Sequence, residues 1–205
     1  MKRLLFLLLG LLTLSGCDSG KPSEKTDAKP VVVLMETTQG NIKIELYPDK
    51  TPETVKNFLR YVDSKAYDGT VFHRVVDNFV IQGGGYELTD GELKERPTDA
   101  PIRNEATKGL SNKRGTISMA RLNDPHSATN QFFISTADNV AGGNGKANLD
   151  PGGVSPAGYC AFGKVIEGMD VVDRIAGGRM ERRFGMDDVP VELVTIKSVR
   201  RVEGQ

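Results

Sequence analysis

Residues 72–86 read FHRVVDNFVIQGGGY, and this stretch decides the fold that we expect for the chain. It predicts two short strands, 70–76 and 79–82, on either side of a turn at Asp77-Asn78. Glycine adopts backbone conformations that other residues avoid, so the triplet at 83–85 is expected to end the pair in a tight turn. A phosphate-binding loop would need Lys-Ser or Lys-Thr after the glycines, and the chain lacks it there.

A hairpin and a helix are expected upstream of this stretch. Residues 31–37 form a largely β-branched run, and 42–46 alternate apolar and charged residues after a turn at 38–41, which predicts a β-hairpin. Thr51-Pro52 is typical of a helix start, with an N-cap followed by proline at the first helical position. The apolar residues that follow have helical spacing and predict about three turns: Val55, Phe58, Leu59 and Val62.

The chain downstream predicts more strands and one further helix. Residues 86–114 are polar and expected to be irregular, and 139–158 are expected to form a long loop rich in Gly, Pro and Asn. The remaining elements are expected to be four strands, 115–120, 131–135, 161–166 and 191–199, and a helix at 169–175. Many strands with two short helices predict a mainly β fold, a closed antiparallel barrel of about eight strands capped by two helices.

The N-terminus predicts a targeting segment. Lys2 and Arg3 precede an almost wholly apolar run at 4–14, which is too short to span a bilayer core of about 30 Å and so predicts a signal peptide over 1–16. Leu14-Ser15-Gly16-Cys17 resembles the bacterial lipobox, which implies cleavage before Cys17, a lipid on its thiol and attachment to a membrane of the bacterial cell envelope. The alternative is an ordinary signal cleaved nearby, with Cys17 incidental.

The segment after Cys17 predicts a tether rather than a folded unit. Residues 18–30 have Ala28 as their only apolar residue, so 17–30 are expected to be the lipidated cysteine and a flexible tether before one domain at 31–203. Asp18 resembles the residue that retains enterobacterial lipoproteins in the inner membrane, and it favours that membrane. A Cys17–Cys160 disulfide is the alternative use of the two cysteines. Basic and acidic residues number 27 each, which argues against a nucleic-acid partner.

Four segments, in the same order along the chain, resemble the cyclophilin signature: FHRVVDNFVIQGGGY at 72–86, GTISMARL at 115–122, SATNQFFIS at 127–135 and AFGKVIEGMDVVDRI at 161–175. The resemblance covers residues 31 to about 200, and the nearest relatives resemble the periplasmic cyclophilins of bacteria. It implies a peptidyl-prolyl cis-trans isomerase that assists the folding of extracytoplasmic proteins. It also implies proline-containing polypeptides as partners, a monomer and no cofactor; with only two His and no HExxH or CxxC, no metal site is expected.

The chemistry of proline isomerisation explains why an arginine is needed. Rotation about a peptide bond has a barrier of about 18–20 kcal/mol, and X–Pro bonds exchange in roughly tens to hundreds of seconds. A catalyst needs only to bind the twisted bond better than either planar form. The twisted prolyl nitrogen becomes a hydrogen-bond acceptor, for which a guanidinium is a permanent, forked donor. The resemblance assigns this donor to Arg74, with Gln82 and Gln131 holding the guanidinium and the substrate backbone.

The resemblance also implies the residues that bind substrate. An apolar socket for the proline ring is expected from Phe79, Val80, Phe133, Leu149 and Tyr159. The edge whose backbone pairs with the bound peptide is expected at Ala120, Arg121 and Leu122.

Several of these positions depart from the family. Val80 stands where Met is common, Tyr159 where His is frequent, and Arg121 and Leu122 replace smaller residues. Asn148 stands where many cyclophilins carry Trp or Phe, so we expect cyclosporin to bind weakly.

Other interpretations stay open at this point. Without the four motifs, Arg74 would be an ordinary surface arginine, and Phe79 and Phe133 ordinary core aromatics. His73 is expected to be a packed neighbour with no chemical role, and His126 to be exposed. Two other functions compete with catalysis: a non-catalytic module or chaperone lipoprotein that binds proline segments, and a structural envelope lipoprotein in which the barrel is a spacer.

Overall fold

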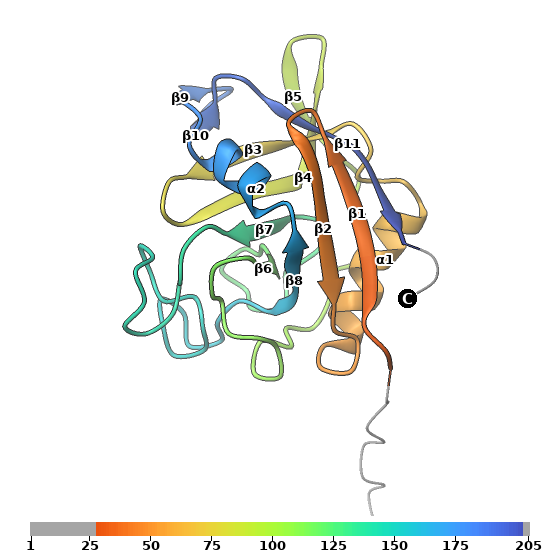
Figure 1. Ribbon diagram of the computed structural model, residues 1–205, viewed down its shortest axis with the longest axis vertical. Coiled ribbons are helices and arrows are strands. Elements are labelled where there is room, and N and C mark those ends of the chain that lie inside the picture. The colour runs from red at the N-terminus through yellow and green to blue at the C-terminus, as the bar shows by residue number, and fades with distance from the viewer. Residues whose placement is uncertain (1–27, 203–205) are drawn as a thin grey trace, which may run out of the picture.

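The computed structural model describes residues 28–202 of the chain (Figure 1). These residues form eleven strands and two helices, most of them short. In chain order the elements are β1 (Val31–Thr37), β2 (Gly40–Leu46), α1 (Pro52–Asp63), β3 (Thr70–Val76), β4 (Val80–Thr89), β5 (Glu92–Glu95), β6 (Thr116–Met119), β7 (Phe132–Ser135), β8 (Ala161–Glu167), α2 (Met169–Ala176), β9 (Met180–Arg183), β10 (Met186–Pro190) and β11 (Val194–Arg201).

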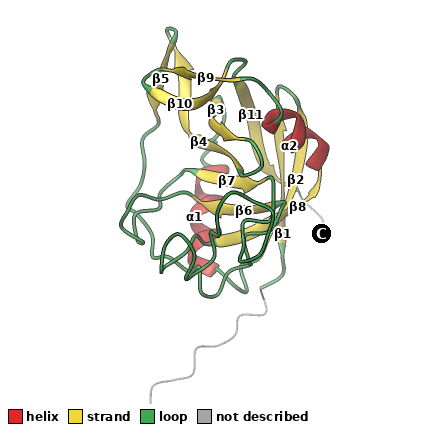
Figure 2. Cartoon of the chain, turned by 90° about the vertical axis from the view of Figure 1, so that its left-hand side faces the viewer, coloured by secondary structure: helices red, strands yellow, loops and turns green. Residues whose placement is uncertain are grey.

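Eight of the strands close into an antiparallel barrel. Their order is β3-β11-β1-β2-β8-β6-β7-β4, and β4 pairs again with β3 to close the ring. β5 pairs with β4 as an extra strand, and β9 pairs with β10 in a separate two-stranded ribbon. Figures 1 and 2 show α1 and α2 at different ends of the barrel. The predicted mainly β fold, with a closed barrel of about eight strands and two helices, is confirmed.

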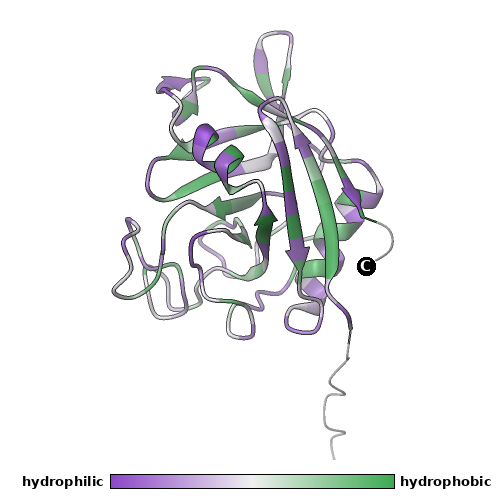
Figure 3. Ribbon diagram, viewed as in Figure 1, coloured by the Kyte–Doolittle hydropathy of each residue, from purple (hydrophilic) through white to green (hydrophobic). Residues whose placement is uncertain are grey.

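One large apolar core fills the barrel, and both helices contribute to it. Hydrophobic residues are concentrated along the barrel strands (Figure 3). Phe58 of α1 contacts three other buried rings at centroid distances of 5.1 to 5.8 Å: Tyr67, Phe132 and Phe162. Because aromatic side chains bury large apolar surfaces, this cluster fixes α1 against strands β7 and β8.

Helix α1 begins where the sequence predicts, but its first turn is held differently. The side chain of Thr51 makes no cap and instead donates to the carbonyl oxygen of Tyr47 at 3.3 Å. The carboxylate of Glu105 accepts hydrogen bonds from the backbone N–H and the hydroxyl of Thr54, both at 2.8 Å. A carboxylate satisfies the free N–H groups of a helix start and interacts favourably with the helix dipole. The loop after β5 is thereby tied to α1.

The expectation of a tight turn at Gly83-Gly84-Gly85 is wrong, because β4 continues through all three glycines to Thr89. The reason for glycine is close approach of other side chains. A Cβ at Gly84 would lie 2.8 Å from Cε1 of Phe132, and one at Gly85 would lie 2.4 Å from Cγ of Gln131. Gly84 also has a φ of +88°, which favours glycine. The triplet therefore lets β4 pass close to the core and to Gln131.

Other segments also differ from the expectation. The stretch 86–114, expected to be irregular, contains the end of β4 and all of β5, joined at Asp90 and Gly91, whose φ values are +56° and +79°. β9 and β10 lie between 180 and 190, where no element was expected, and β11 begins at Val194 rather than at 191.

The predictions for the N-terminus lie outside the described residues. These are the signal peptide, the lipid on Cys17, most of the tether and the cysteine that would pair with Cys160. Cys160 itself is buried, and burial raises the pKa of its thiol to about 11. Between residues 28 and 202, no helix is both long enough and apolar enough to cross a membrane.

Candidate active site

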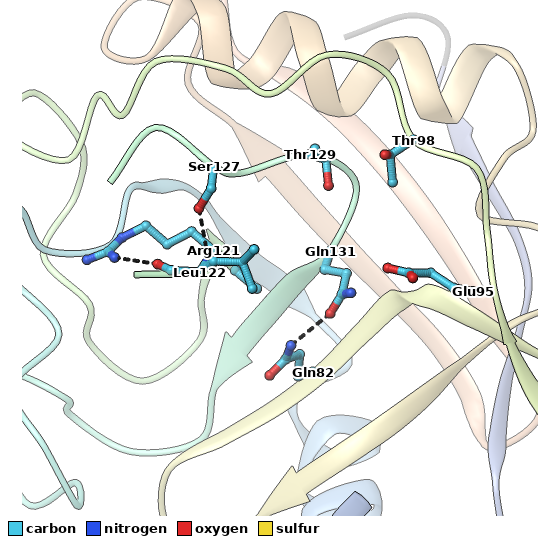
Figure 4. Close-up of a pocket in the computed structure, with 9 residues that line it drawn as sticks. Gln82, Glu95, Thr98, Arg121, Leu122, Ser127, Thr129 and Gln131 are labelled. Atoms are coloured by element: carbon cyan, nitrogen blue, oxygen red, sulfur yellow. Dashed lines mark hydrogen bonds between the residues drawn. The ribbon is translucent and has the colours of Figure 1, made fainter. Parts of the chain in front are cut away.

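Strand register places Arg74 and Gln82 opposite each other. Residue 74 of β3 pairs with residue 82 of β4, so both side chains leave the same face of the barrel wall. Arg74 Nη1 donates a hydrogen bond to Gln82 Oε1 at 3.4 Å. Gln82 Nε2 in turn donates to Oε1 of Gln131 at 2.9 Å (Figure 4). Two neutral amides thus form a relay that orients the guanidinium.

A carboxylate from the β9–β10 ribbon also faces the guanidinium. Asp188 of β10 places Oδ2 at 3.9 Å from Nε of Arg74, and the two side chains are 45% and 39% exposed. Asp188 has a φ of +59°, and the pairing of β10 with β9 is irregular between Met186 and Val189. The distance and the exposure describe a weak ion pair at the rim of the site. No sequence motif predicted this contact.

The guanidinium borders a pocket of about 270 Å³. Its nine lining residues were all predicted as site residues: Arg74, Phe79, Val80, Gln82, Ala120, Arg121, Phe133, Leu149 and Tyr159. Val80, Phe133 and Leu149 form a buried apolar cluster that is separate from the barrel core. The rings of Phe133 and Tyr159 meet edge to face, with centroids 5.8 Å apart. The pocket therefore combines an apolar wall with two arginine side chains, those of Arg74 and Arg121.

Leu122 and Gln131, the other predicted residues, lie around a neighbouring pocket of about 290 Å³. Figure 4 shows Glu95 and Thr98 on the side of this pocket opposite Leu122. Sequence reasoning missed these two residues because it did not predict β5, which carries Glu95. The Asp90-Gly91 dipeptide was the available signal, since Asp-Gly is a strong hairpin sequence.

The loop at 139–158 is held in place by hydrogen bonds and not merely by its ends. The backbone N–H of Leu149 donates to the carbonyl oxygen of Asn139 at 2.8 Å, and that of Tyr159 donates to the carbonyl oxygen of Leu149 at 2.9 Å. The carboxylate of Asp150 accepts from the backbone and side-chain N–H groups of Asn112 at 2.7 and 2.9 Å. These bonds fix Leu149 in the wall of the 270 Å³ pocket.

Asn148 is not among the residues that line this pocket. Its side-chain oxygen accepts a hydrogen bond from the backbone N–H of Asp150 at 3.0 Å, within the loop. Weak cyclosporin binding stays a prediction, which titration calorimetry tests.

His73 is buried beside Arg74 and lines neither pocket. Its ring packs on Tyr86, with centroids 4.7 Å apart, and burial lowers its pKa to about 4. The imidazole is therefore neutral near pH 7 and adds no positive charge next to the guanidinium. His126 is exposed, and its Nδ1 accepts a hydrogen bond from the backbone N–H of Asn104 at 3.1 Å.

Known proteins resemble this chain over most of its length. The family model described as "Cyclophilin type peptidyl-prolyl cis-trans isomerase/CLD" matches residues 32–201. A peptidyl-prolyl cis-trans isomerase of Acinetobacter baylyi is 51% identical over 170 residues, which cover 82% of this chain and 84% of that protein. Peptidyl-prolyl cis-trans isomerase B of Escherichia coli is 47% identical over 168 residues, covering 82% of this chain and 98% of that protein.

Solved structures show the same fold. A cyclophilin-type isomerase of Cryptosporidium parvum aligns with a TM-score of 0.66 at 25% identity, covering 86% of this chain and 100% of that one. A second structure of that isomerase, in the presence of the dipeptide Ala-Pro, aligns with a TM-score of 0.65 at 26% identity, covering 84% and 99%. The chain belongs to the family of cyclophilin-type peptidyl-prolyl cis-trans isomerases.

Proposed function

We propose that this chain accelerates rotation about X–Pro bonds through a hydrogen bond from Arg74 to the prolyl nitrogen of the twisted amide. In the planar amide the nitrogen lone pair is delocalised and is a poor acceptor. As the bond twists, the lone pair localises on nitrogen, so the guanidinium binds the transition state better than either ground state. Such differential binding lowers the barrier, and each 1.36 kcal/mol or so of preference is worth about tenfold in rate.

The observation that carries this proposal is the placement of Arg74 beside an apolar pocket. Gln82 accepts a hydrogen bond from Nη1 of the guanidinium, and Phe79, Phe133 and Leu149 line the same pocket. A proline ring in this pocket would leave water, which favours binding by roughly 25 cal/mol per Å² of apolar surface removed. The bond to be rotated would then lie next to the donor. The dipeptide Ala-Pro, in whose presence the Cryptosporidium parvum isomerase was solved, contains a bond of this kind.

Catalysis is distinguished from passive binding by the donor. A module that only binds proline segments needs the apolar walls but gains nothing from a cation at the prolyl nitrogen. Exchange spectroscopy on an Ala-Pro peptide, with wild type and Arg74→Ala compared, tests this. We expect the wild type to accelerate exchange and the variant to lose most of the acceleration. Equal rates for the two would contradict the role of Arg74 and favour a module that only binds proline segments.

We further propose that the domain acts outside the cytoplasm, attached to a membrane through a lipid on Cys17. The support is the sequence Leu14-Ser15-Gly16-Cys17 and the polar segment 18–30 that follows. A random coil of this length typically reaches roughly 20 Å, so the domain would turn freely close to the membrane. Its clients would be extracytoplasmic polypeptides that fold nearby, and Asp18 favours the inner membrane. Mass spectrometry of the mature N-terminus tests the lipid, and an unmodified residue there would exclude it.

A further inference from the structure

We propose that a groove beside the proline pocket binds an apolar side chain of the same client polypeptide, a few residues from its proline. The groove has a volume of about 990 Å³, and we call it the flanking groove. The residues that matter to the argument are Arg121, Leu122, Val154, Ser155, Pro156 and Tyr159, all in its lining. The inference rests on the proposed function, because it requires a client whose proline occupies the neighbouring pocket.

The flanking groove adjoins the proline pocket. Arg121 and Tyr159 line both of them. An extended polypeptide advances about 3.3 Å per residue and turns successive side chains to opposite sides. When the proline of a client occupies the pocket, side chains two or three residues from that proline therefore extend past Arg121 and Tyr159 and lie over the groove.

Two exposed apolar side chains face this groove. In the described part of the chain, the exposed large hydrophobic residues are Leu88, Leu122, Val154 and Ile166. Leu122 is 77% exposed and Val154 is 61% exposed, the highest fractions of the four, and both lie in the lining of the flanking groove. Exposed apolar groups that gather at one depression, with polar groups such as Asp124 beside them, are typical of binding sites.

The backbone around Leu122 is held by hydrogen bonds. Its N–H donates to Oγ of Ser127 at 2.9 Å (Figure 4). That hydroxyl donates to the carbonyl oxygen of Asp124 at 2.6 Å. The turn at 122–127 is therefore held closed by its own hydrogen bonds. These bonds hold the backbone at Leu122 in a position where its side chain is largely exposed to solvent.

The two walls of the groove are joined by Arg121. Its Nη2 donates to Oγ of Ser155 at 2.7 Å, and its Nε donates to the carbonyl oxygen of Gly158 at 3.2 Å. The guanidinium also stacks over the ring of Tyr159, with its carbon 4.3 Å from the ring centroid. Arg121 thus ties the loop that carries Val154 to the edge that carries Leu122. A groove formed in advance loses little conformational freedom when a client binds.

Peptides with one proline and a single movable leucine test the inference. Each has the form of an alanine heptamer with proline at the centre, and leucine replaces alanine at two or three residues before or after the proline. We expect leucine in at least one position to raise kcat/KM by about three- to tenfold over the all-alanine peptide, through partial burial of its side chain. Exchange spectroscopy gives the rates.

Val154→Ser identifies the groove as the source of the gain. This variant should keep wild-type activity on the all-alanine peptide and lose the gain from leucine. Ile166→Ser, which removes an exposed apolar side chain outside the groove, should keep both. A gain at no position, or a gain that survives in Val154→Ser, would overturn the inference.

Failure of the proposed function can be distinguished from failure of the groove proposal. If the wild type does not accelerate exchange in the all-alanine peptide, the proposed function itself fails; if it does so but leucine gives no gain, the flanking groove alone fails. Sedimentation of the wild type tests a second copy of the chain as occupant. A concentration-dependent dimer that Val154→Ser abolishes would assign the groove to self-association and overturn the client proposal.

Discussion

Arg74 and Gln82 face each other across β3 and β4, and Arg74 Nη1 donates to Gln82 Oε1 at 3.4 Å. The strand register brings the two residues together, and the amide limits the positions that a long, flexible side chain can occupy. Because Gln82 also donates to Gln131, its own orientation is set by a residue from the segment leading into β7. The donor that the proposed mechanism needs is therefore held by the barrel wall itself.

Removal of this amide should impair turnover more than binding. In Gln82→Ala, the guanidinium loses its partner while the apolar pocket stays intact, so we expect kcat to fall about tenfold with KM changed less than twofold or so. Exchange spectroscopy at several peptide concentrations separates the two parameters. Gln39→Ala, an amide outside the candidate site, is the matched control. An unchanged kcat in Gln82→Ala would show that Arg74 does not depend on this contact.

The ion pair between Asp188 and Arg74 should matter little. Both side chains are about two-fifths exposed and their atoms lie 3.9 Å apart, and such pairs are typically worth roughly 0–1 kcal/mol in physiological salt. We expect Asp188→Asn to change kcat/KM by less than about threefold. The control is Asp187→Asn, since Asp187 is the neighbouring carboxylate and pairs with Arg182 instead. A loss of more than tenfold in Asp188→Asn alone would make Asp188 a positioning residue.

Burial of His73 should make the fold less stable in mild acid. Its pKa is lowered by burial from 6.5 to about 4, so between these values the unfolded chain binds a proton that the folded chain excludes. The free energy of unfolding is then highest above pH 6.5 and falls as the pH is lowered towards 4. Linkage gives a loss on the order of 2 kcal/mol from pH 7 to pH 5.

Urea unfolding at pH 7 and pH 5 measures this loss. His73→Gln cannot take up the proton, so the free energy of unfolding of this variant should fall much less between pH 7 and pH 5. Equal pH dependence in wild type and variant would mean that His73 titrates at its ordinary pKa in the folded chain.

Glycine at position 84 should be required for packing as well as for its backbone conformation. Gly84→Ala places a methyl group 2.8 Å from Phe132 at a φ of +88°, and we expect it to destabilise the fold by more than about 2 kcal/mol. Gly91→Ala is a matched control, because φ there is +79° but no atom lies within 4 Å of the added Cβ. It should lose about 1 kcal/mol, from the backbone alone. Equal losses in the two variants would argue against the packing contribution.

The sequence predicted the barrel and its pocket because their signals are local. A β-branched run indicated β1 and alternating apolar residues indicated β2, and the motifs that include Arg74 identified the pocket through a family resemblance. The prediction of a tight turn at 83–85 was wrong because a triplet of glycines permits a turn and close packing equally well. Only the long-range contact with Phe132 and Gln131 decides between them.

The β9–β10 ribbon and Asp188 were missed for a different reason. The turn between these strands has Phe184 and Gly185 at φ values of +54° and +75°, the backbone of a two-residue hairpin turn. Phenylalanine is an unusual residue for the first position, so the turn carries no clear sequence signal. The approach of Asp188 to Arg74 then depends on how the ribbon lies against β3, which local sequence does not encode.

The most direct test of the central claim compares wild type, Arg74→Ala and Arg74→Lys on one Ala-Pro peptide. Exchange spectroscopy gives the rate at saturating enzyme, and chemical-shift titration gives the affinity. We predict that Arg74→Ala loses about a hundredfold in rate while its Kd changes less than about threefold, with Arg74→Lys in between. A variant Arg74→Ala that exchanges the peptide as fast as wild type would contradict the account.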